Sequence, residues 1–518
     1  MKTIIYFTIL LLVALICGTS SEVTTTTLIV DPASTSTSVQ CGLSAADACP
    51  RIIEAYYSFL NSTVAKTNPA DSQFPPLVIE LVPGDYSKNT YTGNINFYGF
   101  DVTIQPYQNQ KVVYSGVNTG NSATMFSFSQ SGKVLPSLVN IYNITFDKLN
   151  CALMNGQMYT PLTVNFENVT ISNSQYTSSQ LIFFTSYSTN QTVVTFTNTA
   201  FDGCSGGLIL VQGVYLGFYR SAITNTNGGQ PISAYSYATL NITDSLFFKN
   251  NVPSANAIIF LNSGNLHLVG TTIQDNNGVA IWGTESVTVT IQTSYILRNT
   301  GSNIGAIRVD QSSSLDIQNS TINQNSGNYG GAIYSSASPV TMANCIVYNN
   351  LASQGMAIYI SGSDLSVTNT SIMYSNDGSS QYTLQNMIYA YNAQVTFTNS
   401  SLNLGSQGVV NYFTLIDCTQ STIISYSTNV TTMGHDAMSC SSCTTTNGAE
   451  NTQDQQVSCP PKSDSSSNGH KNSSSEKKPK KINYAAIFAP IGAVAGVAFI
   501  IVIVVIVKRR NRRNYHSI

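Results

Sequence analysis

One short pattern recurs eleven times between residues 143 and 405, and it constrains the fold more than any other feature of the chain. Each copy runs from an Asn or a small polar residue through two β-formers to one apolar anchor, then to two polar residues. Successive anchors are about 26 residues apart, a period typical of stacked-repeat architectures. The anchors are Phe146, Ile171, Phe201, Ile223, Phe247, Ile273, Ile296, Ile322, Val347, Ile372 and Leu402.

Every repeat carries three short segments with strand character. An alternating segment such as Leu365-Ser-Val367 places every second side chain inward, the anchor segment follows, and a Gly/Ala-Ile segment such as Gly330-Gly-Ala-Ile333 completes the repeat. The repeats show no helical period. We therefore predict an all-β fold, a right-handed parallel β-helix solenoid over residues 77–435 with around 13 coils.

Five consecutive coils place an asparagine three residues after the anchor. Coils in a parallel β-helix stack about 4.8 Å apart, so these amides would lie one above another and form a hydrogen-bonded ladder. Such a ladder would satisfy the backbone of the turn. We expect this structural role for Asn250, Asn276, Asn299, Asn325 and Asn350.

Residues 22–76 are expected to cap the first coil. After a Thr-rich lead, the segment from Cys41 to Cys49 introduces a predicted helix with Asp47 near its start. An amphipathic helix here would cover the core and the unpaired strand edge of the first coil. Its predicted apolar stripe holds Ile52, Ile53, Tyr56, Tyr57 and Leu60.

The beginning of the chain predicts secretion. Lys2 precedes an apolar run from Ile4 to Ile16, and small residues that suit cleavage follow, so we assign residues 1–21 to a signal peptide. A bacterial lipobox ending at Cys17 is the alternative, which the large Ile16 disfavours.

The other end predicts a membrane anchor over residues 484–507, whose apolar run is long enough to span a bilayer. Five basic residues flank it on each side, so the signal peptide decides the orientation. We predict a single-pass type I protein of the plasma membrane with an extracellular N-terminal domain, a flexible Ser/Lys-rich stalk over 462–483 and a basic cytoplasmic tail over 508–518. The small-residue motif from Gly492 to Gly496 suggests a weak transmembrane homodimer.

Charged residues make up only 9% of the chain, so an exposed rod needs another source of hydration. The segment from Glu22 to Pro461 holds 22 acidic and 10 basic residues, a net charge of −12, which excludes nucleic acid as a partner. Ten N-x-[ST] sequons could supply hydration as N-linked glycans in a eukaryotic host. They are at Asn61, Asn143, Asn168, Asn190, Asn241, Asn319, Asn369, Asn399, Asn429 and Asn472.

Cysteine use fits an oxidising compartment. Cys41 and Cys49 suit a disulfide beside the cap. Disulfides among Cys440, Cys443 and Cys459 would close the C-terminal segment 436–461, with Cys418 as a further partner.

Cys440-Ser-Ser-Cys443 also fits half of a zinc site, but no second pair accompanies it. The remaining cysteines suit buried apolar positions, and they are Cys151, Cys204 and Cys345.

The repeat resembles that of the chlamydial polymorphic outer membrane proteins. The resemblance rests on Phe247-Phe-Lys-Asn250 and on Gly330-Gly-Ala-Ile333. More broadly, the chain is similar to the pectin-lyase-like β-helix superfamily, well over about residues 240–360 and loosely over 75–430. The resemblance implies surface display and adhesion. Those bacterial proteins end in an outer-membrane barrel, whereas this chain ends in a hydrophobic helix, which fits a eukaryotic cell-surface protein better.

Enzymes of the same β-helix superfamily cleave polyuronides with clustered aspartates, so the resemblance raises the question of whether this chain carries such a cluster. Such a cluster needs carboxylates at matching positions on neighbouring coils. Asp147 and Asp202 share a repeat position, but Ser172 occupies the coil between them. The other aspartates of the repeat region are scattered, at Asp244, Asp275, Asp310, Asp316, Asp364 and Asp377. We expect no catalytic site, no cofactor and no metal.

The leading interpretation is a non-enzymatic cell-surface glycoprotein that displays a β-helical rod for adhesion, recognition or surface-coat function. Its ligand would be a cell-surface protein or a carbohydrate, and the 29 tyrosines suit either recognition or strand packing. The alternative is a membrane-tethered polysaccharide-active lyase or hydrolase with a diverged site. A receptor role would require a partner, because the tail has no room for a signalling domain.

Overall fold

The computed structural model describes residues 25–38, 40–64, 75–86, 95–97, 101–115, 124–129, 138–187, 192–252, 256–375, 386–405, 414–432, 436–447 and 459. The predicted signal peptide, stalk, transmembrane segment and tail lie outside these residues, as do Asn190, Asp377 and Asn472. The chain divides into a unit of residues 1–460 and a unit of residues 461–518. Within the described ranges, no helix is both long and apolar enough to cross a bilayer.

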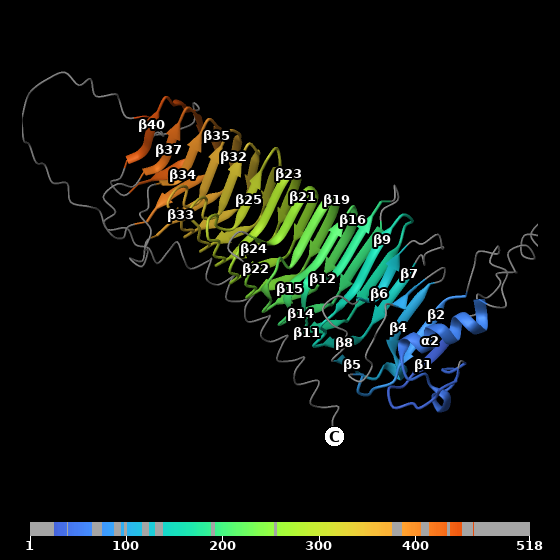
Figure 1. Cartoon of the computed structure of the whole chain (residues 1–518). Helices are drawn as coiled ribbons and strands as arrows, with labels where there is room; N and C mark the ends of the chain where they lie inside the picture. The colour runs from blue at the N-terminus through green and yellow to red at the C-terminus, as the bar shows by residue number, and fades with distance from the viewer. Residues whose placement is uncertain are drawn as a thin grey trace, which may run out of the picture. The chain divides into compact units, whose positions relative to one another are not determined.

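The described part of the chain is a parallel β-helix, in which every strand pairing is parallel and joins one coil to the next (Figure 1). Three stacks of strands form three faces. The third face is a 13-stranded sheet with one short strand per coil. Its strands are β5 Val112–Ser115, β8 Ile144–Asp147, β11 Thr170–Ser172, β14 Ala200–Asp202, β17 Ala222–Thr224, β20 Leu246–Phe248, β22 Thr272–Gln274, β24 Tyr295–Leu297, β27 Thr321–Asn323, β30 Ile346–Tyr348, β33 Ser371–Tyr374, β36 Ser401–Leu404 and β39 Asn429–Thr431.

The first two faces share a 28-stranded sheet, because three long strands run through the corner between them. The strands of the first face are β3 Ile95–Asn96, β6 Thr124–Ser129, β9 Ala152–Met158, β12 Gln175–Ser186, β15 Ser205–Gln212, β18 Asn227–Gly228, β19 Ile232–Thr243, β21 Ala257–Val269, β23 Val279–Gln292, β25 Ile307–Asp310, β28 Ile333–Ser336, β31 Ile358–Ser361, β34 Asn386–Tyr391, β37 Thr414–Thr419 and β40 Asp436–Ser441.

The second face holds the C-terminal halves of β19, β21 and β23 together with strands of its own. These are β1 Thr26–Val30, β2 Leu77–Leu81, β4 Val102–Pro106, β7 Leu138–Tyr142, β10 Thr163–Glu167, β13 Thr192–Thr197, β16 Val214–Tyr219, β26 Ser314–Gln318, β29 Val340–Ala343, β32 Asp364–Thr368, β35 Gln394–Thr398, β38 Thr422–Tyr426 and β41 Thr444–Asn447.

The apolar anchors of the sequence repeat lie at the centres of the third-face strands, where all eleven are buried. Neighbouring anchors pair in register, as Ile296 does with Ile322 and Ile322 with Val347. Because side chains alternate along a strand, the residues on either side of an anchor point outward. The repeat therefore builds one continuous core that passes through the coils.

The coil turns sharply where the second face meets the third, and the turning residue adopts a left-handed backbone. Asn143, Asn319 and Asn369 occupy this corner with φ values of 56°, 50° and 48°. Asparagine tolerates this conformation better than other side chains do, since its short amide bonds locally. The corner explains why asparagine recurs before the third-face strand.

The cap differs in detail from the prediction. Its helix is α2, Ile52–Phe59, with the short segments η1 Ala45–Asp47 before it and η2 Leu60–Val64 after it; a further one, η3 Tyr107–Asn109, lies between β4 and β5. Asp47 does not cap α2, because it lies within η1 and accepts a hydrogen bond from Ser36. Tyr57 is exposed, and Phe59 is buried in its place. Figure 1 shows α2 beside β1 and β2 at one end of the coils.

The solenoid extends beyond residues 77–435 at both ends. β1 pairs along its whole length with β2, so the lead segment already contributes a strand to the second face. At the other end, β40 and β41 continue the first two faces past residue 435. β1 pairs with β2, which lies about fifty residues later in the chain. The spacing of the sequence repeat does not reveal this pairing, so the sequence analysis placed β1 outside the solenoid.

Candidate recognition surface

A column of aromatic side chains follows the outward side of the first face. Its members occupy one register position on successive coils, from β21 to β34. Phe260 is buried and the other members are partly buried. We call this set the aromatic column; it consists of Phe260, Trp282, Arg308, Tyr334, Tyr359 and Tyr389.

The three tyrosines of the column stack on one another, whereas the rings of Phe260 and Trp282 meet edge to face at 76°. The Tyr359 ring lies 4.9 Å from that of Tyr334 and 4.8 Å from that of Tyr389, with interplanar angles of 14° and 18°. The Arg308 guanidinium lies 4.1 Å from the Trp282 ring centroid and 6.0 Å from that of Tyr334. Because the faces of the stacked tyrosine rings cover each other, these tyrosines present their ring edges and hydroxyl groups to the surroundings.

Partial burial in the column raises the pKa of two of its tyrosines. Burial raises the pKa of Tyr359 to about 12, and the neighbouring tyrosines add to the shift. Burial, together with Asp417 on the next coil, raises the pKa of Tyr389. The Asp417 carboxyl itself has a raised pKa because it is half-buried. At neutral pH Tyr359 and Tyr389 are therefore neutral phenols that can donate hydrogen bonds.

Two polar atoms beside Arg308 lack a hydrogen-bond partner among the described residues. They are the indole Nε1 of Trp282 and the Oδ1 of Asp310, both buried. Arg308 itself is fixed by Asp310, whose Oδ2 lies 2.6 Å from its Nε. A buried donor or acceptor without a partner costs about 1–3 kcal/mol, so these two atoms are a local cost to the fold beside Arg308.

The sequence contains a signal for this column that the repeat analysis did not use. In five coils an isoleucine of the first face is followed directly by Trp, Arg or Tyr, as in Ile281-Trp282 and Ile358-Tyr359. The isoleucine points into the core, so the next residue must point outward. Aligning the coils on this isoleucine would have revealed the column.

The five predicted ladder asparagines lie one above another in the core, all buried. The Asn276 amide donates to the carbonyl oxygen of Phe247 at 3.1 Å and to Oδ1 of Asn299 at 2.7 Å. The Asn299 amide continues the chain by donating to Asn325 at 3.0 Å. Each amide thus passes a hydrogen bond to the next coil while satisfying a strand carbonyl.

A second buried ladder, which the sequence analysis missed, runs along the corner before the third face. Its hydroxyls accept the backbone N–H of the preceding coil, as Ser245 does from Ser221 and Ser320 from Ser294. Each hydroxyl also donates to a nearby carbonyl. The members are Ser221, Ser245, Thr271, Ser294, Ser320, Thr370 and Ser400.

The sequons largely follow this corner. Five of them place Asn at the left-handed turning position, where the side chain is exposed; the residue after it enters the core, and a strand begins there or one residue later. Backbone geometry thus gives N-x-[ST] a structural reason, and glycosylation stays a prediction. The five are Asn143, Asn168, Asn319, Asn369 and Asn399. Asn61 and Asn429 are also exposed, and Asn241 is partly buried on β19.

The two aspartates that share a repeat position are Asp147 and Asp202, and each binds side chains of the following coil. Asp147 accepts hydrogen bonds from Ser172 and Asn173, and Asp202 accepts them from Thr224 and Asn225. Each carboxylate is thus occupied by the following coil. Among the residues that the structure describes, His, Cys, Asp and Glu do not gather in any group of three that would hold a metal ion.

Three disulfides link the six cysteines near the ends of the solenoid. Cys41 pairs with Cys49, Cys418 with Cys443, and Cys440 with Cys459. Cys440 and Cys443 therefore bond to different partners.

The other three cysteines, Cys151, Cys204 and Cys345, are buried and lie outside these three disulfides. Cys345 replaces a hydroxyl in the corner ladder, with its Sγ 3.2 Å from the carbonyl oxygen of Ala343. Cys204 lies at the position that the ladder asparagines occupy in later coils, and burial raises the pKa of its thiol to about 11.

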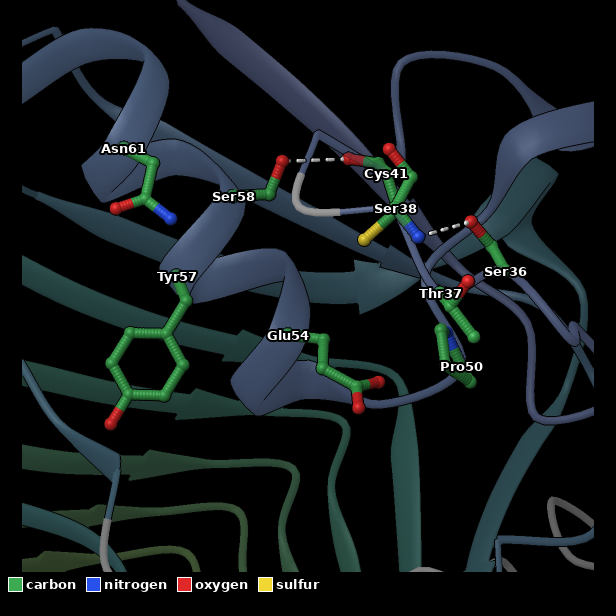
Figure 2. Close-up of a pocket in the computed structure, with 9 residues that line it drawn as sticks. All are labelled: Ser36, Thr37, Ser38, Cys41, Pro50, Glu54, Tyr57, Ser58 and Asn61. Atoms are coloured by element: carbon green, nitrogen blue, oxygen red, sulfur yellow. Dashed lines mark hydrogen bonds between the residues drawn. The ribbon is translucent and has the colours of Figure 1, made fainter.

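A cleft of about 210 Å³ lies between α2 and the lead segment. In Figure 2 the Ser58 hydroxyl donates to the carbonyl oxygen of Cys41, and the backbone N–H of Ser38 donates to Ser36. Glu54 is the one acid in the lining and pairs with Arg51. A single paired carboxylate does not supply the two groups that glycoside cleavage needs. The lining residues are Ser36, Thr37, Ser38, Cys41, Pro50, Glu54, Tyr57, Ser58 and Asn61.

Comparison with known proteins supports the fold. A family model described as a right-handed beta helix region matches residues 181–337, from within β12 to just after β28. This match and the coil geometry support a parallel β-helix of right-handed winding. The similarity to pectin-lyase-like proteins and to chlamydial repeats remains a prediction. No curated protein matches the chain in sequence.

Among solved structures, tailspike protein 3 of bacteriophage CBA120 is similar, with a TM-score of 0.33 and 12% identity. The alignment covers 75% of this chain and 58% of that chain. This chain therefore spans 58% of the length of the tailspike protein. A likeness at this TM-score carries no argument about function.

Proposed function

We propose that the protein is a non-enzymatic cell-surface glycoprotein whose β-helix binds a protein or carbohydrate of another surface. Its first face carries the binding site, and residues 484–507 anchor it in the plasma membrane. The aromatic column is the observation that carries the proposal. It concentrates six large side chains, five of them aromatic, at one register position of a chain that is otherwise rich in small polar residues.

The chemistry of the column suits recognition. Aromatic and arginine side chains dominate binding energy at interfaces, because they bury a large area at low entropic cost. Here the stacking fixes the rings before any ligand arrives, which reduces the ordering cost further. Arg308, held by Asp310 and lying over the Trp282 ring, adds a positive charge to the column.

A cell-aggregation assay tests the adhesive role. Cells that display the full-length chain are compared with otherwise identical cells that lack it. The proposal predicts faster aggregation, or stronger attachment to a second cell type, when the chain is present. Equal behaviour of the two populations would contradict adhesion.

An activity assay tests the rival function, a membrane-tethered polysaccharide-active enzyme. The purified full-length protein is incubated with a panel of polyuronides, and unsaturated and reducing ends are measured. We expect none above the level of the buffer. Release of such ends that increases with protein concentration would overturn the non-enzymatic proposal.

A further inference from the structure

Tyr159 and Tyr187 form an exposed pair on neighbouring coils. Tyr159 follows the last residue of β9 and Tyr187 the last residue of β12, whose ends are in register. The backbone N–H of Tyr187 donates to the carbonyl oxygen of Met158 at 2.7 Å, which fixes the two chain segments side by side. The rings stack with centroids 5.0 Å apart and planes inclined by 25°.

This pair differs from the other ring contacts in the described ranges. Its side chains are 58% and 60% exposed, whereas each of the other contacts includes at least one partly or fully buried ring. In the aromatic column, for example, Tyr359 is enclosed by its neighbours. Tyr159 and Tyr187 therefore combine two properties: both rings are open to a soluble oxidant, and each is held next to its reaction partner.

We propose that Tyr159 and Tyr187 are a site of oxidative cross-linking, at which a haem peroxidase with hydrogen peroxide joins them as dityrosine. Each phenol loses one electron and its hydroxyl proton. The ring carbons ortho to the oxygens then bond, and their two hydrogens move to the oxygens, which restores both phenols. The peroxide accepts the two electrons and two protons and leaves as two water molecules.

The coil geometry favours this reaction over coupling between molecules. Two radicals that meet on one scaffold react in an effectively unimolecular step, which raises the rate greatly over a bimolecular encounter. The bond would join the coil of β9 covalently to that of β12. Encounter with an extracellular peroxidase rests on the surface location proposed above, whereas the coupling chemistry does not.

The test oxidises the purified full-length protein with a haem peroxidase and limiting hydrogen peroxide. Glu167 is the one glutamate between the two tyrosines, so a glutamyl endopeptidase places them on separate peptides. We expect a joined pair of peptides, lighter than their sum by two hydrogens, in protein that remains monomeric. Unfolding in urea should lower the yield on the order of tenfold, since the register is lost.

Phenylalanine variants identify the site without removing the ring stack. Tyr159→Phe and Tyr187→Phe should each abolish the joined peptides. Tyr237→Phe is the matched control, because Tyr237 is 81% exposed, and it should leave the yield unchanged. Joined peptides that persist in either of the first two variants would overturn the proposal. So would oxidation that links molecules to one another but never Tyr159 to Tyr187. Neither result depends on whether the protein mediates adhesion.

Discussion

At the scale of the residue, buried amides and hydroxyls hold the coils in register. An amide carries both a donor and an acceptor, so Asn276 can accept from the preceding coil and donate to the following one. A serine hydroxyl does the same with one backbone N–H and one carbonyl. An aliphatic side chain of similar size would leave these backbone groups without partners. The ladders therefore replace some apolar packing with hydrogen bonds that define the register between coils.

Substitution of a buried ladder residue should be costly. Asn276→Ala removes bonds to Asn250, Asn299 and the carbonyl of Phe247. We expect a loss on the order of 3 kcal/mol in the free energy of unfolding, measured from the urea midpoint. The neighbouring Asn277→Ala is the control, since Asn277 is exposed and should change stability by about 0.5 kcal/mol or less. Equal effects would show that the buried ladder does not stabilise the coils.

The buried thiols of Cys204 and Cys345 should be inert in the folded protein. Burial raises the pKa of Cys204 from its ordinary value of 9.0 to about 11, and burial also raises the pKa of Cys345. Because the folded state keeps the thiol protonated, its contribution to stability is complete below pH 9 and declines as the pH rises towards 11. Iodoacetamide at pH 8 should label neither thiol until urea unfolds the chain. Rapid labelling of native Cys204 would contradict this assignment.

At the scale of the element, the repeat predicts the third face well, because its signal is local. The eleven anchors lie at the centres of short strands, and the alternating segments form the second face. Two features could not be predicted from the sequence repeat, because they depend on tertiary contacts. One is the pairing of β1 with β2, and the other is burial of Phe59 in place of Tyr57, which the contact of α2 with the first coil decides.

The left-handed corner gives a prediction about backbone rather than side chain. Asn369 has φ of 48°, which glycine accepts readily and a β-branched residue does not. We expect Asn369→Val to lower stability by about 1–2 kcal/mol and Asn369→Gly to change it little, by thermal unfolding. Both variants remove the same sequon, so a glycan cannot account for the difference. Equal stability of the two variants would count against strain at this corner.

At the scale of the whole molecule, the sequence predicted the scaffold but not the surface. Periodicity identifies residues that point inward, since these repeat in type from coil to coil. Outward positions vary in type, so Trp282, Arg308 and Tyr359 become one column only when the coils are aligned. In the described coils the carboxylates of Asp147 and Asp202 accept hydrogen bonds from the following coil, and the expectation of no catalytic site stays a prediction.

Anchoring is tested by truncation. Removal of residues 484–518 deletes the predicted membrane segment and tail while leaving the described coils untouched. We expect the truncated chain in the culture medium and the full chain in the membrane fraction, by immunoblot. A full-length chain that alkaline carbonate extracts from membranes would contradict a transmembrane anchor.

The central claim is that the aromatic column is the binding surface, and a paired-variant adhesion assay tests it most directly. The triple variant Tyr334→Thr, Tyr359→Thr, Tyr389→Thr removes the stacked tyrosines while keeping residues that favour strands. Tyr295→Thr is the control, because Tyr295 is an exposed tyrosine on the third face. With equal surface expression and unchanged melting temperature, we predict that the triple variant loses adhesion at least about tenfold and the control keeps it. Full adhesion by the triple variant would contradict the account.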